Sequence, residues 1–374
     1  MVDALPDIAR KGRGAVSNAS GRFEAHARVA VDDGWALSDV VDADGDADAP
    51  PLSIPALATT VIDEHPKSII TRNQSPDVPF DRSLNPYRGC EHGCVYCFAR
   101  PTHAYQGLSP GLDFETRLFA KPDAARLLAD ELRKPGYKPA TLAMGTNTDP
   151  YQPIEKQRAI TRAVLRVLAE CDHPVAIVTK SNLILRDLDI LAPMAGKGLV
   201  SVAISVTTLD PVLARRMEPR APTPARRLDA IAGLAGAGVP VAVMVAPVVP
   251  AINDHEIEAI LEAAVGAGAG AADYILLRLP GEVRDLFSEW LAAHYPDRMK
   301  RALGRMAGHR GGKLYEAQWG TRMRGHGTDA ELLAQRFRLA LARLGLGRER
   351  AAGRRLATGL FHPPVRAGDQ LSLF

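Results

Sequence analysis

Six short apolar runs alternate with amphipathic stretches over most of the chain, beginning near residue 83. The apolar runs are continuous, which is typical of strands covered on both faces. We expect strands at residues 83–87, 141–144, 175–179, 199–206, 240–247 and 273–279. We expect helices at residues 122–133, 154–170, 183–195, 224–237, 254–267 and 282–294. Each connection is long enough for a right-handed crossover, so this α/β pattern predicts a parallel sheet, either a partial (β/α)6 barrel or a doubly wound sheet.

The segments on either side of this repeat have a different character. Residues 1–60 show neither the strand nor the helix period, and we interpret them as an irregular N-terminal arm, partly disordered or lying over the main domain. The barrel then occupies residues 61–295. Residues 296–362 are expected to form a basic helical C-terminal extension, with a helix near 329–344, and residues 363–374 a flexible tail.

Composition places the chain among ordinary globular proteins. Of its 374 residues, 46% are hydrophobic and 24% charged, which excludes a disordered or fibrous chain. No apolar run is long enough for a transmembrane helix, so no membrane partner is expected. The N-terminus places acids and prolines where a signal peptide needs an apolar stretch, which predicts a cytoplasmic protein.

Positive charge is concentrated near the C-terminus. The net charge of the chain is only +3, but the segment from Arg298 to Arg355 contains 15 Lys or Arg and only four acids, a local charge of +11. The rest of the chain therefore carries about −8. Such a segment could neutralise the phosphates of DNA. A solvated helical surface is the alternative interpretation.

Three of the four cysteines lie within eight residues of one another. Cys90, Cys94 and Cys97 follow the first predicted strand with the spacing C-x3-C-x2-C, while Cys171 stands alone. In a reducing compartment a close cluster of this kind indicates metal or redox chemistry. Three protein ligands leave one metal position open for a substrate or cofactor. The alternative is a zinc site completed by His92 or His103.

The cysteine spacing, with Tyr96 just before the third cysteine, resembles the signature of the radical S-adenosylmethionine (SAM) superfamily. The resemblance implies a partial (β/α)6 barrel and a [4Fe–4S] cluster on the three cysteines, with SAM on the fourth iron. The segments GTNTDPYQPIE, VTKS, ISVTTLD and MEPRAPTPARR look like the branch related to spore photoproduct lyase, the DNA repair photolyase-like group. The activity implied is reductive cleavage of SAM to a 5′-deoxyadenosyl radical that abstracts hydrogen.

The same resemblance suggests which residues contact SAM. Lys180 and Ser205 match positions that hold its carboxylate, Tyr96 would lie beside the adenine, and Ala246 matches a backbone contact to the adenine. Asp149, in the polar segment after the second strand, is expected to line the SAM or substrate cavity. An electron donor such as flavodoxin or ferredoxin is implied as a partner.

One position departs from the family pattern. Spore photoproduct lyase carries, just past its second strand, a Cys that returns a hydrogen atom to the repaired base, and the matching residues 144–146 here are Met-Gly-Thr. Cys171 precedes the third strand and so belongs to the opposite, amino end of the barrel, where we expect a small buried side chain. The resemblance to spore photoproduct lyase therefore implies the generation of the radical, but it does not imply the same substrate.

The extreme C-terminus contains a separate signal. It resembles the short peptide by which bacterial DNA polymerases and repair proteins bind the sliding clamp, through Gln370, Leu371, Ser372, Leu373 and Phe374. We therefore expect a radical SAM enzyme acting on nucleic acid, in the manner of a DNA repair lyase. The alternatives are a radical SAM enzyme for a small molecule or a protein, and a non-catalytic zinc-binding adaptor for the clamp or DNA.

Overall fold

The computed structural model describes residues 7–27, 29, 57–346 and 356–365. Its main sheet has seven strands, in the spatial order β10 (Ala271–Leu276), β9 (Val241–Val248), β8 (Val200–Ser205), β7 (Val175–Thr179), β6 (Leu142–Met144), β3 (Arg82–Leu84) and β2 (Ile70–Arg72). All neighbours pair in parallel except β2 and β3. The six parallel strands lie in chain order, without the reversal of a doubly wound sheet, which confirms the partial barrel.

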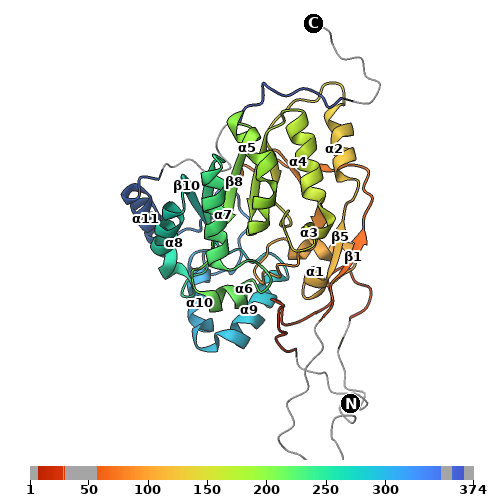
Figure 1. Cartoon of the computed structure of the whole chain (residues 1–374). Coiled ribbons are helices and arrows are strands. Elements are labelled where there is room, and N and C mark those ends of the chain that lie inside the picture. The colour runs from red at the N-terminus through yellow and green to blue at the C-terminus, as the bar shows by residue number, and fades with distance from the viewer. Residues whose placement is uncertain (1–6, 28, 30–56, 347–355, 366–374) are drawn as a thin grey trace, which may run out of the picture.

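Helices cover the outer face of this sheet, as the amphipathic pattern requires (Figure 1). They are α2 (Ala124–Leu132), α3 (Glu155–Arg158), α4 (Ile160–Glu170), α5 (Leu188–Gly196), α7 (Pro224–Gly236), α8 (Ile257–Gly266) and α11 (Thr328–Arg343). The single helix expected at residues 154–170 is wrong. The chain breaks at Ala159, with φ 51°, because the buried Glu155 carboxylate accepts the backbone N–H of Thr161 at 3.0 Å and starts a second helix there.

Several short elements escaped the sequence pattern. A three-stranded sheet joins β1 (Thr60–Asp63), β5 (Arg117–Ala120) and β4 (Tyr87–Arg88), and α1 (Asp113–Thr116) precedes β5. The helices α6 (Pro211–Met217) and α10 (Pro296–Gly308) were also not expected. They lie at the carboxyl end of the barrel together with α9 (Val283–His294), which the sequence predicted (Figure 1). Short 3-10 helices lie at Arg100–Gln106, Asn182–Asp187 and Asp254–Glu256.

A second apolar cluster fixes the helices at the carboxyl end of the barrel. Trp290 of α9 is fully buried, stacks on Phe287 and donates its indole N–H to the Arg216 carbonyl at 2.9 Å. Val95 belongs to the same cluster, and it lies in the loop that carries Cys90, Cys94 and Cys97, here called the cysteine loop. The packing of α6 and α9 therefore supports the loop that carries the three cysteines.

The two flanking segments contact opposite ends of the barrel. Residues 13–17 of the N-terminal arm are buried against the cysteine loop and α1. Near the C-terminus, the N–H of His362 donates to the Cys171 carbonyl at 3.1 Å, and Arg133 donates to the carbonyls of Pro364 and Val365. Residues 356–365 thus lie at the amino end of the strands. No helix in the described part of the chain is long and apolar enough to cross a membrane.

We expect the free energy of unfolding to fall as the pH drops from about 6.5 to about 4. Burial lowers the pKa of His173 to about 4, and the neutral ring is held between the Tyr137 hydroxyl at 2.8 Å and the Pro174 carbonyl at 3.1 Å. In the unfolded chain His173 binds a proton as the pH falls below about 6.5, whereas in the folded chain it does so only near pH 4. Between these two pH values the free energy of unfolding therefore falls, by about 3 kcal/mol at most. Urea denaturation across the interval measures the loss. In His173→Gln this part of the pH dependence should disappear, and an identical pH profile in the variant would contradict the assignment.

Candidate functional site

The loop that carries Cys90, Cys94 and Cys97 lies at the carboxyl ends of the parallel strands. Cys90 and Cys94 are buried and Cys97 is partly exposed. The N–H of Cys90 donates to the Phe114 carbonyl and that of Val95 to the Met217 carbonyl, each at 3.0 Å. These bonds fix the loop to α1 on one side and to α6 on the other.

The next loop along the sheet braces the cysteine loop. Gln152 donates its amide to the Gly89 carbonyl at 3.2 Å and accepts the N–H of Glu91 at 2.9 Å. Thr148 donates its hydroxyl to the same Gly89 carbonyl at 2.8 Å. The polar segment after β6 therefore has a structural explanation, in that it determines the shape of the loop that bears the thiols.

The thiols lie in an environment that suits a positively charged group. Burial raises the pKa of Cys94 and of Cys97, and the charge of neighbouring cysteines raises both further, while Lys180 lowers both. Buried thiols become thiolates when a metal supplies the missing positive charge. In the described ranges no three His, Cys, Asp or Glu side chains are gathered as a metal-ion site. A cubane cluster, unlike one ion, offers a separate iron to each thiolate.

Lys180 and Tyr96 come together beside the thiols. Lys180 follows β7, and its Nζ lies 5.8 Å from the centroid of the Tyr96 ring and 3.7 Å from Glu218 Oε1. Burial lowers the pKa of Lys180, although the cysteines nearby raise it. The ammonium group is therefore a partly desolvated cation at the strand ends, suited to a carboxylate ligand.

Glu218 is the site residue that the sequence interpretation missed. It is buried, and its carboxylate accepts from the Tyr96 hydroxyl, from Arg227 and from Thr207 Oγ1, the last at 2.8 Å. It lies just after α6, in the MEPR segment already associated with the family. An acidic residue between a methionine and a proline gives no sign of burial, because only the fold brings its partners to it.

Asp149 serves to hold neighbouring segments together. Its carboxylate accepts from Thr179 Oγ1 at 2.6 Å and from the Lys180 N–H at 2.8 Å, and lies 3.4 Å from His92 Nδ1. Burial alone would raise the pKa of Asp149, but His92 and these hydrogen bonds lower it to about 2. The carboxylate thus links the cysteine loop to the end of β7, and its expected contact with SAM or substrate stays a prediction.

The other two predicted SAM contacts lie on neighbouring strands. Ser205 ends β8, and its carbonyl accepts from Arg227 Nη1 at 3.2 Å. Ala246 lies in β9, and its carbonyl accepts from Thr207 Oγ1 at 3.2 Å. Both lie near the carboxyl ends of their strands, the same edge of the sheet at which Lys180 follows β7. Their contacts with SAM also stay predictions.

The position after β6 excludes any side chain. A Cβ built on Gly145 would lie 1.9 Å from the Val178 carbonyl oxygen, and the residue has φ +89°. A cysteine at this point would displace the backbone of β7. Cys171 is buried at the end of α4, and its thiol donates to the Val167 carbonyl at 3.0 Å.

Comparison with known proteins adds a family and a fold. The model of the radical SAM superfamily matches residues 84–264. An uncharacterized protein of Mycobacterium tuberculosis is 42% identical over 226 residues, which are 60% of this chain and 66% of the relative. An uncharacterized protein of Methanocaldococcus jannaschii is 27% identical over 173 residues, which are 46% of this chain and 62% of the relative.

Solved structures of spore photoproduct lyase share the fold. The lyase complexed with dinucleoside spore photoproduct has a TM-score of 0.54 at 14% identity, covering 76% of this chain and 79% of the lyase chain. A variant of that lyase with bound AdoMet and dinucleoside spore photoproduct has a TM-score of 0.51 at 13% identity, covering 76% and 78%. At these identities the likeness concerns the fold alone.

Proposed function

Because this chain belongs to the radical SAM superfamily, with a fold like that of spore photoproduct lyase, we propose that it cleaves SAM reductively at a [4Fe–4S] cluster and acts on nucleic acid. The observation that carries the proposal is the position of three thiols on one braced loop, at the ends of six parallel strands, with Lys180 beside them. The cytoplasm, where thiols stay reduced, suits such a site, and flavodoxin or ferredoxin is a suitable electron donor.

We assign some residues of the site to binding the cluster or SAM, and others to holding those residues in position. Cys90, Cys94 and Cys97 would hold three irons of the cluster, and Lys180 would bind the carboxylate of SAM. Glu218 neutralises Arg227 and orients the Tyr96 hydroxyl, so it fixes the ring beside Lys180. When bound, cluster and SAM supply a 5′-deoxyadenosyl radical that removes hydrogen from a substrate C–H.

Anaerobic reconstitution tests the proposal. We expect about four irons and four sulfides per chain, visible charge-transfer absorption and release of 5′-deoxyadenosine with dithionite. Damaged oligonucleotides should stimulate that release, whereas an unstimulated enzyme would point to a small-molecule or protein substrate. One zinc and no labile sulfide would select the non-catalytic adaptor instead.

Lys180→Met is expected to raise the KM for SAM about tenfold or more. The variant removes a charge-assisted hydrogen bond, which is typically worth about 1.5–3 kcal/mol. Initial rates of 5′-deoxyadenosine release against SAM concentration measure the change. Lys197→Met is the control, since Lys197 is exposed and pairs with Asp172 at the amino end of the strands. An unchanged KM in Lys180→Met would contradict the proposed contact.

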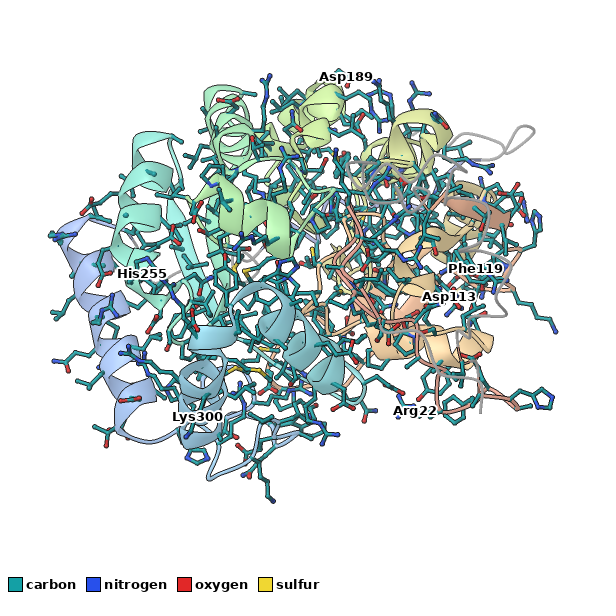
Figure 2. All side chains as sticks on the ribbon, turned by 90° about the horizontal axis from the view of Figure 1, so that it is seen from below. Arg22, Asp113, Phe119, Asp189, His255 and Lys300 are labelled. Atoms are coloured by element: carbon teal, nitrogen blue, oxygen red, sulfur yellow. The ribbon has the colours of Figure 1, made fainter. Side chains whose placement is uncertain are left out.

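Only part of the positive charge of the basic segment is available for contacts with nucleic acid. Arg322, Arg324 and Arg336 are engaged within the chain, with Asp77, Asp273 and Glu258 respectively. In α10, Arg305 is also engaged, with Asp254 and Asp329, whereas Lys300 and Arg301 have no ion pair among the described residues. This helix lies at the carboxyl end of the strands, the end seen in Figure 2, where Lys300 is labelled. We propose that α10 contributes phosphate contacts near the cysteine loop.

Deleting residues 370–374 is expected to abolish binding to the sliding clamp and to leave SAM cleavage unchanged. These residues lie outside the described part of the chain, but the chain is fixed at Pro364 and Val365 by Arg133, at the amino end of the strands. The last described residues thus lie at the opposite end of the strands from the cysteine loop, so SAM cleavage should not depend on the deleted peptide. Surface plasmon resonance with immobilised clamp measures the affinity. Equal affinity of both proteins would exclude the clamp as partner of this peptide.

A further inference from the structure

An arginine without a charged partner lies beside the cysteine loop. Arg278 follows β10 by two residues, at the carboxyl end of the sheet, and its guanidinium lies 5.5 Å from the centroid of the Phe98 ring. Phe98 directly follows Cys97 and is 49% exposed. Arg278 therefore lies next to the third of the predicted cluster ligands.

The side chain of Arg278 is partly exposed, and one of its donors is buried without a partner among the described residues. Its Nε is shielded from solvent and has no hydrogen-bond partner, and no ion pair or hydrogen bond of this side chain is found among residues 7–27, 29, 57–346 and 356–365. A buried N–H donor without a partner costs free energy in the folded protein. An anion that fits between its donors would recover that free energy, and a planar guanidinium suits phosphate in particular.

A second arginine holds this one in place. Arg310 is 3% exposed and donates to the carbonyls of Leu277 and Met306, so it fixes the backbone next to Arg278. Burial lowers the pKa of Arg310, and the positive charge of Arg278 lowers it further. Glu316, which raises that pKa, supplies only one negative charge. The pair leaves an excess of positive charge at the strand end.

An open groove continues from this point along the surface. Its volume is about 630 Å³, and its lining begins at Leu279. Glu282 of the groove pairs with Arg22, and Arg284 pairs with Asp285. Lys313 also lines the groove and has no ion-pair partner in the part of the chain that the structure describes. Lys313 in the groove and Arg278, next in the chain to the lining residue Leu279, both lack an ion pair among the described residues, and two such cations are suited to an anion that repeats, such as a phosphate backbone.

Two exposed aromatic rings are linked to the groove through Arg22. Phe23 and Tyr105 are 56% and 68% exposed, and their ring centroids lie 5.1 Å apart. Arg22 lies over both rings and links them to Glu282 of the groove; Figure 2 labels it on the face where the strands end. Unpaired bases stack on such rings, which favours a nucleic-acid strand over a sugar phosphate or a peptide.

We propose that Arg278 binds a backbone phosphate of a single-stranded segment of the substrate and so directs the neighbouring nucleotide to the cysteine loop. This inference rests on the proposed function, since it names the group by which the same site recognises nucleic acid. Arg278 is a specificity-determining residue in this scheme, and Arg310 is a positioning residue.

Fluorescence anisotropy of the reconstituted full chain with a labelled single-stranded oligothymidylate tests the proposal. Arg278→Gln is expected to weaken binding about tenfold or more, and to lower the slope of log affinity against log salt by about 0.7. Arg278→Lys should keep the slope but bind more weakly than the natural chain. Arg226→Gln is the control, because Arg226 is exposed on α7 and pairs with Asp229, and it should match the natural chain.

Two further ligands identify the source of the phosphate. An oligothymidylate with a neutral methylphosphonate backbone should bind the natural chain and Arg278→Gln equally. Thymidine monophosphate should compete poorly, whereas competition at the concentration that saturates the oligomer would assign Arg278 to a free nucleotide and overturn the proposal. Equal affinity and salt slope in Arg278→Gln, or no binding by the natural chain, would also overturn it. The iron and sulfide content of each preparation tests the proposed function separately.

Discussion

Replacing Cys94 with alanine is expected to abolish the visible absorption of the reconstituted protein and to reduce 5′-deoxyadenosine release by about a thousandfold or more. Cys94 is buried in the part of the cysteine loop that is bound to α6; burial and the charge of Glu218 raise its pKa, and the charge of Lys180 lowers it. Removing its thiolate would leave two of the three proposed ligands, too few to hold a cluster with one open iron, and reductive cleavage of SAM would be lost with the cluster. Iron and sulfide analysis together with product release measures both losses.

Cys171→Ala is the matched control for this experiment. Cys171 is also buried, but it lies at the amino end of the strands, where its thiol donates to the Val167 carbonyl. The control should retain the full cluster and full product release, with only a small loss of stability. A Cys94→Ala protein that still holds four irons would show that the three cysteines are not the ligands, and the proposed function would fail with it.

The strands and the cysteine loop could be predicted because their signals are local. Val175–Thr179 is apolar at nearly every position since both faces of the strand are covered, and this is visible without knowledge of its neighbours. The small sheet was missed for the opposite reason. The burial of Thr60–Asp63 is slight, so the strand owes its conformation to pairing with Arg117–Ala120, a contact that no local period reports.

The buried acids of the site were equally invisible. Glu218 and Glu115 read as ordinary surface residues, because a carboxylate is rarely buried without a partner. Their partners, Arg227 and Arg100, are supplied by the fold. The sequence therefore predicted the residues that we propose to carry the chemistry, but not the ion pairs that surround them.

Glu115→Gln is expected to lower the free energy of unfolding by about 3–5 kcal/mol and to release the N-terminal arm from the cysteine loop. Glu115 is fully buried and accepts from Arg100 and from the N–H groups of Gly14 and Ala15, the latter two at 2.9 and 2.8 Å. Arg100 in turn donates to the Cys94 carbonyl at 2.9 Å. Removing the charge leaves a buried guanidinium unpaired, which is among the costliest single changes in a protein interior.

Urea denaturation measures the stability, and limited trypsin digestion measures the release of the arm through faster cleavage at Arg13. Glu258→Gln is the control, since Glu258 pairs with Arg336 at the surface, and this variant should lose no more than about 1 kcal/mol. The arm contacts the cysteine loop so closely that a Cβ on Gly14 would lie 1.8 Å from the Gly93 carbonyl oxygen. Glu115→Gln should therefore also lose its cluster faster in air than the natural chain. Unchanged digestion at Arg13 and unchanged bleaching in air would show that the arm stays bound without the carboxylate, and that it does not protect the cluster.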